Sequence, residues 1–241
     1  MASLGNSLTQ AYFSAGAASD NPSGSWATGD DPAVGSHYSR LLALNPAIAG
    51  HAYNDAQSGS LMAATFGQAG LAVGQGAQYV TIESGTNDVC TATVTAMTST
   101  SDFANSLRAT LTQLSTGLPG VRILVASVPN WAGLWANFQT DPAALSAWAV
   151  FARCPVLLGA NATAAGRAAA AQRISDLNTV IVSVCREFPT CGEDQGAMFS
   201  LWSSLTVADL APDFFHLSLA GQARLAEATW RASPYSHRRR G

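Results

Sequence analysis

The chain has 241 residues, of which 48% are hydrophobic and 11% are charged, and its formal net charge is −3. This length can bury one sizeable core, so we expect a single domain over residues 1–235, followed by a basic tail at 236–241. The tail holds three of the twelve arginines, and without them the charge would be −3 minus 3, or −6. No basic face then remains, which argues against a nucleic-acid partner.

Short β-branched runs alternate with longer helical stretches, which predicts a parallel sheet covered by helices. The predicted strands cover residues 1–4 (a stub), 48–53, 79–83, 121–128 and 197–200. The predicted helices cover residues 7–15, 36–44, 60–74, 102–118, 143–152, 164–185 and 220–230. In the clearest of them, 102–118, apolar residues recur at spacings of four, four and three, at Phe103, Leu107, Leu111 and Leu114. This helix should lie on the sheet.

A long segment rich in Gly, Ser, Asp and Pro covers residues 16–35. Loops of this length in compact domains are usually functional or disordered. Its Trp26, together with Trp131 and Trp135 in the loop after the strand at 121–128, could form the wall of an acyl-binding pocket. The alternative is that these side chains only cover the core, since aromatic residues supply large buried area anywhere.

Four short motifs each lie at a loop of the predicted sheet. Ser7 follows the first strand and opens a helix, Gly59 follows the second strand, Asn87 follows the third, and His216 precedes the last helix. In an open parallel sheet the ligand lies beyond the carboxyl ends of the strands, where such loops converge. We therefore expect these four residues to meet at one edge of the sheet.

The residue types of these motifs suit acyl transfer. Ser7 at a helix start would be a nucleophile, but a serine needs a base to be activated. His216 is the best candidate base, because Asp213 lies three residues upstream and can orient the imidazole ring. A single serine before a helix is more often an N-cap, yet an N-cap requires none of the other three motifs.

A tetrahedral intermediate also needs hydrogen-bond donors for its oxyanion. The backbone N–H groups of Ser7 and Gly59 and the side-chain amide of Asn87 are the candidates. Each of the last two has a simpler alternative, since Gly59 could be an ordinary turn glycine and Asn87 could belong to a strand-ending turn. Neither alternative explains why the motifs occur together.

The four cysteines, Cys90, Cys154, Cys185 and Cys191, allow three pairings, and two disulfides are plausible. No Cys-x-x-Cys occurs, and neither His37 nor His51 lies at ligand spacing from a cysteine or another histidine, so we expect no metal. The even cysteine count and low charge favour secretion. No signal peptide precedes the first motif, so we expect a trimmed leader or a misassigned start. No apolar run approaches the ~20 residues of a membrane span.

With these residues in place, the chain resembles the SGNH or GDSL hydrolase family, whose conserved letters match Ser7, Gly59, Asn87 and His216. Its cysteines and tryptophans resemble most the secreted actinobacterial esterases or lipases. The resemblance implies an α/β fold, with a flavodoxin-like parallel sheet in three layers (α/β/α), and ester hydrolysis through an acyl-enzyme. It also singles out Asn54 as a possible substrate-binding residue. The chain departs from the family's Gly-Asp-Ser-Leu block at Asn6.

We therefore expect a monomeric, secreted serine esterase or lipase without a cofactor, acting on short to medium acyl or lipid-like esters. Activity should rise as His216 loses its proton, near pH ~6.5. One alternative is an O-deacetylase acting on acetyl-xylan or a similar carbohydrate, and the other is a non-catalytic carbohydrate-binding relic. No Gly-x-Ser-x-Gly or His-Glu-x-x-His motif supports an α/β-hydrolase or a zinc hydrolase.

Overall fold

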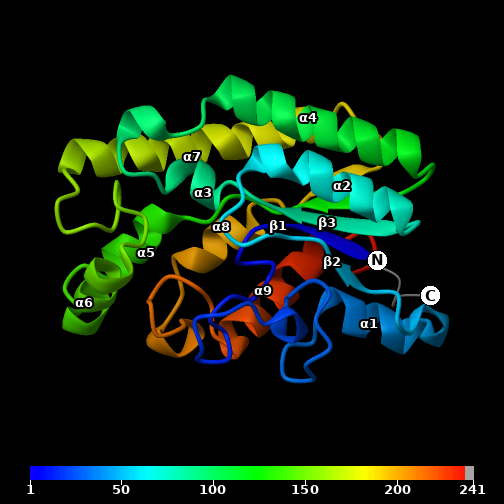
Figure 1. Cartoon of the computed structure of the whole chain (residues 1–241), viewed down its shortest axis with the longest axis horizontal. Helices are drawn as coiled ribbons and strands as arrows, with labels where there is room; N and C mark the ends of the chain where they lie inside the picture. Colours follow the sequence, from blue (N-terminus) through cyan, green and yellow to red (C-terminus); the bar gives the residue numbers. More distant parts are fainter. Residues whose placement is uncertain (237–241) are drawn as a thin grey trace.

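The computed structural model describes residues 1–236 and places a parallel sheet between two layers of helices (Figure 1). In this part of the chain the sheet has five strands in the order β2-β1-β3-β4-β5, and every neighbouring pair is parallel. The strands are β1 (Ala2–Gly5), β2 (Tyr53–Asn54), β3 (Tyr79–Glu83), β4 (Arg122–Val125) and β5 (Cys191–Glu193). The predicted three-layer α/β/α class with a flavodoxin-like parallel sheet is confirmed.

The helices divide between the two faces of the sheet and its carboxyl edge (Figure 1). One face carries α2 (Thr65–Gly74), α4 (Thr100–Gly117) and α7 (Ala164–Cys185), and the other carries α1 (His37–Leu44), α8 (Ala197–Trp202) and α9 (Leu219–Ala232). Beyond the carboxyl ends of the strands lie α3 (Thr86–Val89), α5 (Trp131–Phe138) and α6 (Pro142–Phe151). These three helices lie at the sheet edge where the four sequence motifs were expected to meet.

Helix α4 forms as its periodicity predicted. Ser99 caps its first turn by accepting a hydrogen bond from the backbone N–H of Asp102. Its apolar stripe, which includes Phe103 and Leu111, is fully buried. This stripe is part of the hydrophobic core, and α4 packs against both α2 and α7. The predicted helices at 36–44, 143–152, 164–185 and 220–230 are likewise present, within two residues at each end.

The predicted helix at 7–15 is wrong. The segment makes one helical turn, in which Gln10 N–H donates to the carbonyl of Asn6 and Tyr12 N–H to that of Ser7. Ala11 and Phe13 then adopt left-handed backbone with φ of 48° and 66°, which interrupts any helix. The predicted helix at 60–74 is shorter than expected, because residues 62–64 form a 3₁₀ turn before α2 begins.

Two predicted strands are also wrong. Residues 48–53 contribute only Tyr53 to β2, because a 3₁₀ turn at Pro46–Ile48 and a left-handed Gly50 occupy the preceding residues. Residues 197–200 belong to helix α8, and the carboxylate of Asp194 accepts hydrogen bonds from the backbone N–H groups of Gly196 and Met198 at its start. The fifth strand of the sheet is instead β5, which precedes this helix. Its three residues show no apolar alternation from which a strand could be predicted.

Two disulfides join the four cysteines as Cys90–Cys154 and Cys185–Cys191. The second closes a small loop before β5, and the first spans 64 positions and ties the segment after α3 to the segment after α6. Within residues 1–236 no helix is long and apolar enough to cross a membrane. Residues 237–241, which carry the predicted basic tail beyond Ser236, lie outside the described residues.

Candidate active site

Ser7 lies on a tight turn directly after β1. The turn begins at Gly5, where φ is 143° and an added Cβ would lie 2.0 Å from the carbonyl oxygen of Glu83. Only glycine permits this approach of the two chains. Asn6 then accepts a hydrogen bond from the backbone N–H of Leu8 at 3.0 Å, which closes the turn around Ser7.

A buried carboxyl group on β3 is hydrogen-bonded to two side chains of this turn. Glu83 is 0% exposed, and its two oxygens accept hydrogen bonds from Asn6 Nδ2 at 3.2 Å and from Thr9 Oγ1 at 3.3 Å. Burial raises the pKa of Glu83 from 4.5 to about 7, although these hydrogen bonds lower it. The turn therefore rests on a carboxyl group that titrates near neutral pH.

Ser7, His216 and Asp213 form one chain of hydrogen bonds. The Oγ atom of Ser7 lies 2.9 Å from Nε2 of His216, and Nδ1 of His216 lies 2.6 Å from Oδ2 of Asp213. The three residues are 7%, 3% and 0% exposed. The structure thus brings together the three residues that the sequence singled out for nucleophile, base and carboxylate, in the order that general-base activation of a serine requires.

The protonation states of this chain follow from burial and charge. Burial lowers the pKa of His216 below its usual 6.5, and Arg153 lowers it further, whereas Asp213 and Asp20 raise it. Burial would raise the pKa of Asp213, but the hydrogen bond and charge of His216 together with Arg153 hold it below 3.8. At neutral pH the chain therefore consists of a neutral imidazole beside an ionised carboxylate, which is the form that accepts a proton from serine.

The three candidate oxyanion donors come from separate segments of the chain. Among the described residues, the backbone N–H groups of Ser7 and Gly59 donate to no other group. Gly59 is exposed and has φ of 84°, which favours glycine. Asn87 uses one of its amide N–H bonds on the carbonyl of Ser60 at 2.9 Å, and an amide nitrogen carries two. Each candidate thus retains a donor.

The match of a family model fits this geometry. The model of the GDSL-like lipase/acylhydrolase family matches residues 3–224, which is most of the chain. The chain belongs to the GDSL-like lipase/acylhydrolase family. This confirms the predicted resemblance, and with it the reaction class, which is hydrolysis of carboxylic esters.

Solved structures share the fold of this GDSL-like chain at low sequence identity. A putative GDSL-like lipase from Parabacteroides merdae is 16% identical with a TM-score of 0.63, over 96% of this chain and 93% of the other. An acetylxylan esterase from Geobacillus stearothermophilus is 16% identical with a TM-score of 0.55, over 96% and 92%. A phospholipase A1 from Streptomyces albidoflavus is 16% identical with a TM-score of 0.55, over 96% and 98%. Comparison with curated protein sequences gives no significant match.

The other residues that the sequence singled out in this GDSL-like chain take different positions. Trp26 and Trp131 are both 0% exposed, which favours the alternative that they cover the core. Trp135 is partly exposed, and the guanidinium of Arg167 lies 4.5 Å from its ring. Asn54 donates to the carbonyl of Thr9 and accepts from the backbone N–H of Ala56. The nitrogen and the oxygen of its side-chain amide are thus both bonded to backbone groups.

One residue beside the site went unpredicted. The Nε atom of Arg153 lies 3.1 Å from Oδ2 of Asp213, and no motif or spacing in the sequence links the two residues. Its only sequence signal is its place next to Cys154, which gains meaning once the Cys90–Cys154 disulfide is known. Glu83 was expected only as the last residue of a strand, four positions before Asn87.

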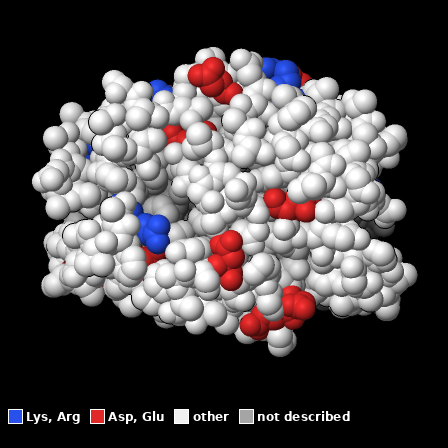
Figure 2. Space-filling model, in the orientation of Figure 1, with Lys and Arg blue, Asp and Glu red and all other residues white. Residues whose placement is uncertain are grey.

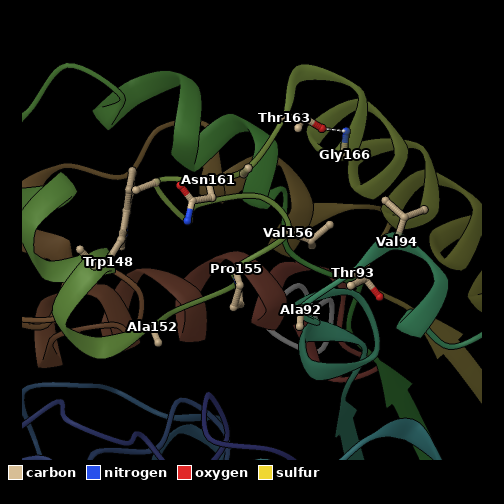
Figure 3. A pocket seen from close by; sticks show the side chains of 14 residues that line it. Ala92, Thr93, Val94, Trp148, Ala152, Pro155, Val156, Asn161, Thr163 and Gly166 are labelled. Atoms are coloured by element: carbon tan, nitrogen blue, oxygen red, sulfur yellow. Dashed lines mark hydrogen bonds between the residues drawn. The ribbon is translucent and has the colours of Figure 1, made fainter.

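A hollow of about 500 Å³ lies between α6 and the start of α7 (Figure 3). Methyl groups and one proline form most of its lining, with Trp148 at one end. None of the candidate catalytic residues lines it, but one of its lining residues bonds the loop between Asp213 and His216. Trp148 donates its indole N–H to the carbonyl of Phe214 at 2.9 Å, and Ala152 precedes Arg153. The hollow therefore shares a wall with the loop that carries Asp213 and His216.

Charge is sparse on the face of the molecule that is drawn in Figure 2. Figure 2 shows that most of this face carries no charged side chain and that it is hollowed toward its left-hand side, where the carboxyl ends of the strands lie in Figure 1. Among the described residues, no group of three or more His, Cys, Asp or Glu is placed to hold a metal ion.

Proposed function

We propose that this protein is a serine esterase in which Ser7 is the nucleophile, His216 the general base and Asp213 the carboxylate that orients it. The observation that carries the proposal is the continuous chain of hydrogen bonds from Ser7 Oγ through His216 to Asp213. A serine that served only as a helix cap would not need a buried histidine at 2.9 Å, and no helix starts at Ser7.

The reaction then runs in two halves. Ser7 Oγ attacks the ester carbonyl carbon while His216 Nε2 takes its proton, and the protonated imidazole is stabilised by Asp213. The tetrahedral intermediate collapses, the C–O bond to the alcohol breaks, and His216 returns the proton to the departing alcohol. Water then attacks the acyl-enzyme with the same histidine as base, and the carboxylic acid leaves.

We further propose that the backbone N–H groups of Ser7 and Gly59 and the side chain of Asn87 stabilise the oxyanion. Two of these donors are backbone groups with no other partner among residues 1–236. The third is held by its bond to Ser60, so it needs little reorganisation when charge develops.

For the substrate we propose short to medium acyl or lipid-like esters, with the acyl part entering the apolar hollow beside α6. Its lining of Ala, Val and Pro side chains suits a hydrocarbon chain, and the hollow adjoins the His216 loop. The alternative of an acetylated carbohydrate is represented among proteins of similar fold by the acetylxylan esterase, and the lipid alternative by the phospholipase A1. A non-catalytic carbohydrate-binding relic would retain the fold without turnover.

The decisive experiment is acid release from p-nitrophenyl esters of increasing chain length, a phospholipid and acetyl-xylan, with wild type beside Ser7→Ala. We expect turnover by wild type alone, with a preference for acyl chains longer than acetyl. Equal rates in Ser7→Ala would refute the assignment of the nucleophile. No turnover of any ester would favour the relic, and a preference for acetyl-xylan would favour the deacetylase.

The role of the hollow is tested by Ala149→Phe, because Ala149 lines it and is exposed on α6. We expect the variant to lose activity on the longer esters and to keep it on acetate. Ser146→Phe, on the same helix but outside the lining, is the matched control and should change neither. Equal effects of both variants on all chain lengths would rule out this pocket.

We also propose that the protein is secreted and acts as a monomer. The structure has two disulfides. Disulfides form and persist in oxidising compartments, which supports secretion. All of the proposed catalytic residues come from one chain, so the chemistry requires no second copy.

A further inference from the structure

The carboxylate of Asp213 is completely buried and receives hydrogen bonds from four donors. Its Oδ1 atom accepts from the backbone N–H groups of Phe215 at 3.1 Å and His216 at 2.9 Å. Its Oδ2 atom accepts from His216 Nδ1 at 2.6 Å and from Arg153 Nε at 3.1 Å. The Arg153 side chain is the one donor that comes from outside the 213–216 loop, and it carries a full positive charge.

The guanidinium of Arg153 lies among three aromatic rings. Its central carbon lies 5.7 Å from the ring centroids of Tyr12 and Phe151 and 6.0 Å from that of Phe215. Tyr12 also packs against the His216 ring, with centroids 4.8 Å apart. Each ring attracts the guanidinium electrostatically at this range, which favours its position beside Asp213.

The backbone of Arg153 is fixed as well. Its neighbours Ala152 and Cys154 both adopt left-handed backbone, with φ of 48° and 44°. Cys154 is joined by a disulfide to Cys90, which lies three residues after Asn87. The disulfide therefore connects the segment of Arg153 to the segment that supplies a proposed oxyanion donor.

We propose that Arg153 is a positioning residue of this site, which holds Asp213 in the orientation that His216 needs. The proposal rests on the proposed function, since it assigns Arg153 a role through the Asp213–His216 pair. A simpler alternative is that Arg153 only neutralises a buried carboxylate and so stabilises the fold. The two alternatives differ in what happens to kcat when the charge is kept and the guanidinium geometry is lost.

The electrostatic consequence can be given a sign. The groups that act on His216 are Asp213 and Asp20, which raise its pKa, and Arg153, which lowers it. The Tyr12 ring also faces the imidazole. Removing the positive charge of Arg153 should therefore raise the pKa of His216 and move the acid limb of kcat/KM to higher pH. An arginine that only neutralised Asp213 would move this limb as well, so the variant that separates the two alternatives is Arg153→Lys, which keeps the charge.

The test compares wild type with Arg153→Met and Arg153→Lys. For Arg153→Met we expect kcat to fall by about 10-fold to 100-fold with little change in KM, because a misplacement of about 1 Å can cost about 10²-fold. The acid limb should move upward. Arg153→Lys keeps the charge but loses the guanidinium geometry, so its acid limb should stay near that of wild type while kcat recovers only in part.

Arg167→Met is the matched control. Arg167 also lies over an aromatic ring, that of Trp135, and bonds the backbone of Leu157 and Ala162, but makes no contact with Asp213. It should leave the acid limb in place. If Arg153→Met does not fold, Arg153→Lys still tests the proposal, which is overturned if its kcat equals that of wild type.

A readout independent of turnover separates this proposal from the proposed esterase function. The imidazole of His216 is titrated by NMR, with its resonance assigned from a His216→Asn variant. An upward shift of the His216 pKa in Arg153→Met, absent in Arg167→Met, supports the action of Arg153 on the imidazole through Asp213 even if no ester is hydrolysed. Unchanged titration together with unchanged kcat in Arg153→Met overturns the proposal, whatever the substrate.

Discussion

The side-chain amide of Asn6 donates a hydrogen bond to Glu83 over 3.2 Å, at the base of the turn that carries Ser7. The family block Gly-Asp-Ser-Leu would place a carboxylate at position 6, whereas this chain has an amide there and a carboxyl group on the adjacent strand. The acidic group beside the turn is thus supplied by β3. This pairing explains why the amide does not disturb the turn, since Asn6 also accepts from the backbone of Leu8.

The pairing predicts a compensating pair of substitutions. Asn6→Asp alone places two carboxyl groups in one buried site and should destabilise the protein by about 2 kcal/mol or more at pH 8. Asn6→Asp combined with Glu83→Gln restores one carboxyl group and one amide, and should return most of that loss. Urea unfolding of the four proteins in a double-mutant cycle measures the coupling. Additive effects of the two changes would contradict the pairing.

Glu83 also predicts a pH dependence of stability. Its folded pKa, about 7, lies above the ordinary 4.5, so the fold favours the protonated form. The stabilisation is fully present below pH ~4.5 and is lost as the pH rises through about 7. Glu83→Gln cannot ionise, so its stability relative to wild type should improve by about 3 kcal/mol between pH 4 and pH 8. A constant difference between the two proteins across this range would refute the prediction.

His37 predicts a dependence of the opposite sign. Burial lowers its pKa from 6.5 to about 3, and its ring nitrogens pair with the hydroxyl groups of Tyr79 and Thr229. The neutral imidazole stabilises the fold fully above pH ~6.5, and this contribution falls as the pH drops toward 3. Between pH 7.5 and pH 5 wild type should lose about 2 kcal/mol that His37→Gln does not lose. Urea unfolding at the two pH values, with the exposed His51→Gln as control, measures the difference.

The pH profile of catalysis should reflect the environment of His216. Because burial and Arg153 hold its pKa below 6.5, kcat/KM should rise with pH through a midpoint below pH ~6.5. This midpoint is lower than the value of about pH 6.5 that the sequence alone predicted. The profile is measured with an ester whose own ionisation does not change in this range. A midpoint above 6.5 would contradict the structural environment described for the imidazole.

Asn87→Ala should lower kcat by about 10²-fold or more, because it removes one proposed oxyanion donor. KM should change little, since the donor acts on the charge that develops after binding. Asn178→Ala is the matched control, because Asn178 likewise bonds backbone, at Val128, but has no place among the proposed donors. Equal losses of kcat in the two variants would show that the effect comes from stability alone.

The sheet and the candidate site could be predicted from the sequence to different extents. The long amphipathic helices, α4 above all, follow from side-chain periodicity and were located correctly. Ser7, Asp213 and His216 could be singled out because each motif follows a strand or precedes a helix at the same sheet edge. What joined them was the combination of residue types, since no single motif specified the chemistry.

The remaining features depend on tertiary contacts that leave no local signal. Strand β5 has three residues, and its place beside β4 is fixed by pairing, not by its own apolar pattern. The turn after Ser7 resembles a helix in composition, but left-handed residues at Ala11 and Phe13 end it. Arg153 lies 60 positions from Asp213, and nothing in the sequence predicted that the segment after α6 would reach the site.

The central claim is that Ser7 is the activated nucleophile, and covalent labelling tests it most directly. Wild type is treated with a fluorophosphonate, and the modified residue is located by peptide mass spectrometry. We expect one label per chain on Ser7, no label in Ser7→Ala, and labelling slowed by about 10²-fold or more in His216→Asn, which lacks the base. An unlabelled wild type, or a Ser7→Ala variant labelled as fast as wild type, would contradict the account.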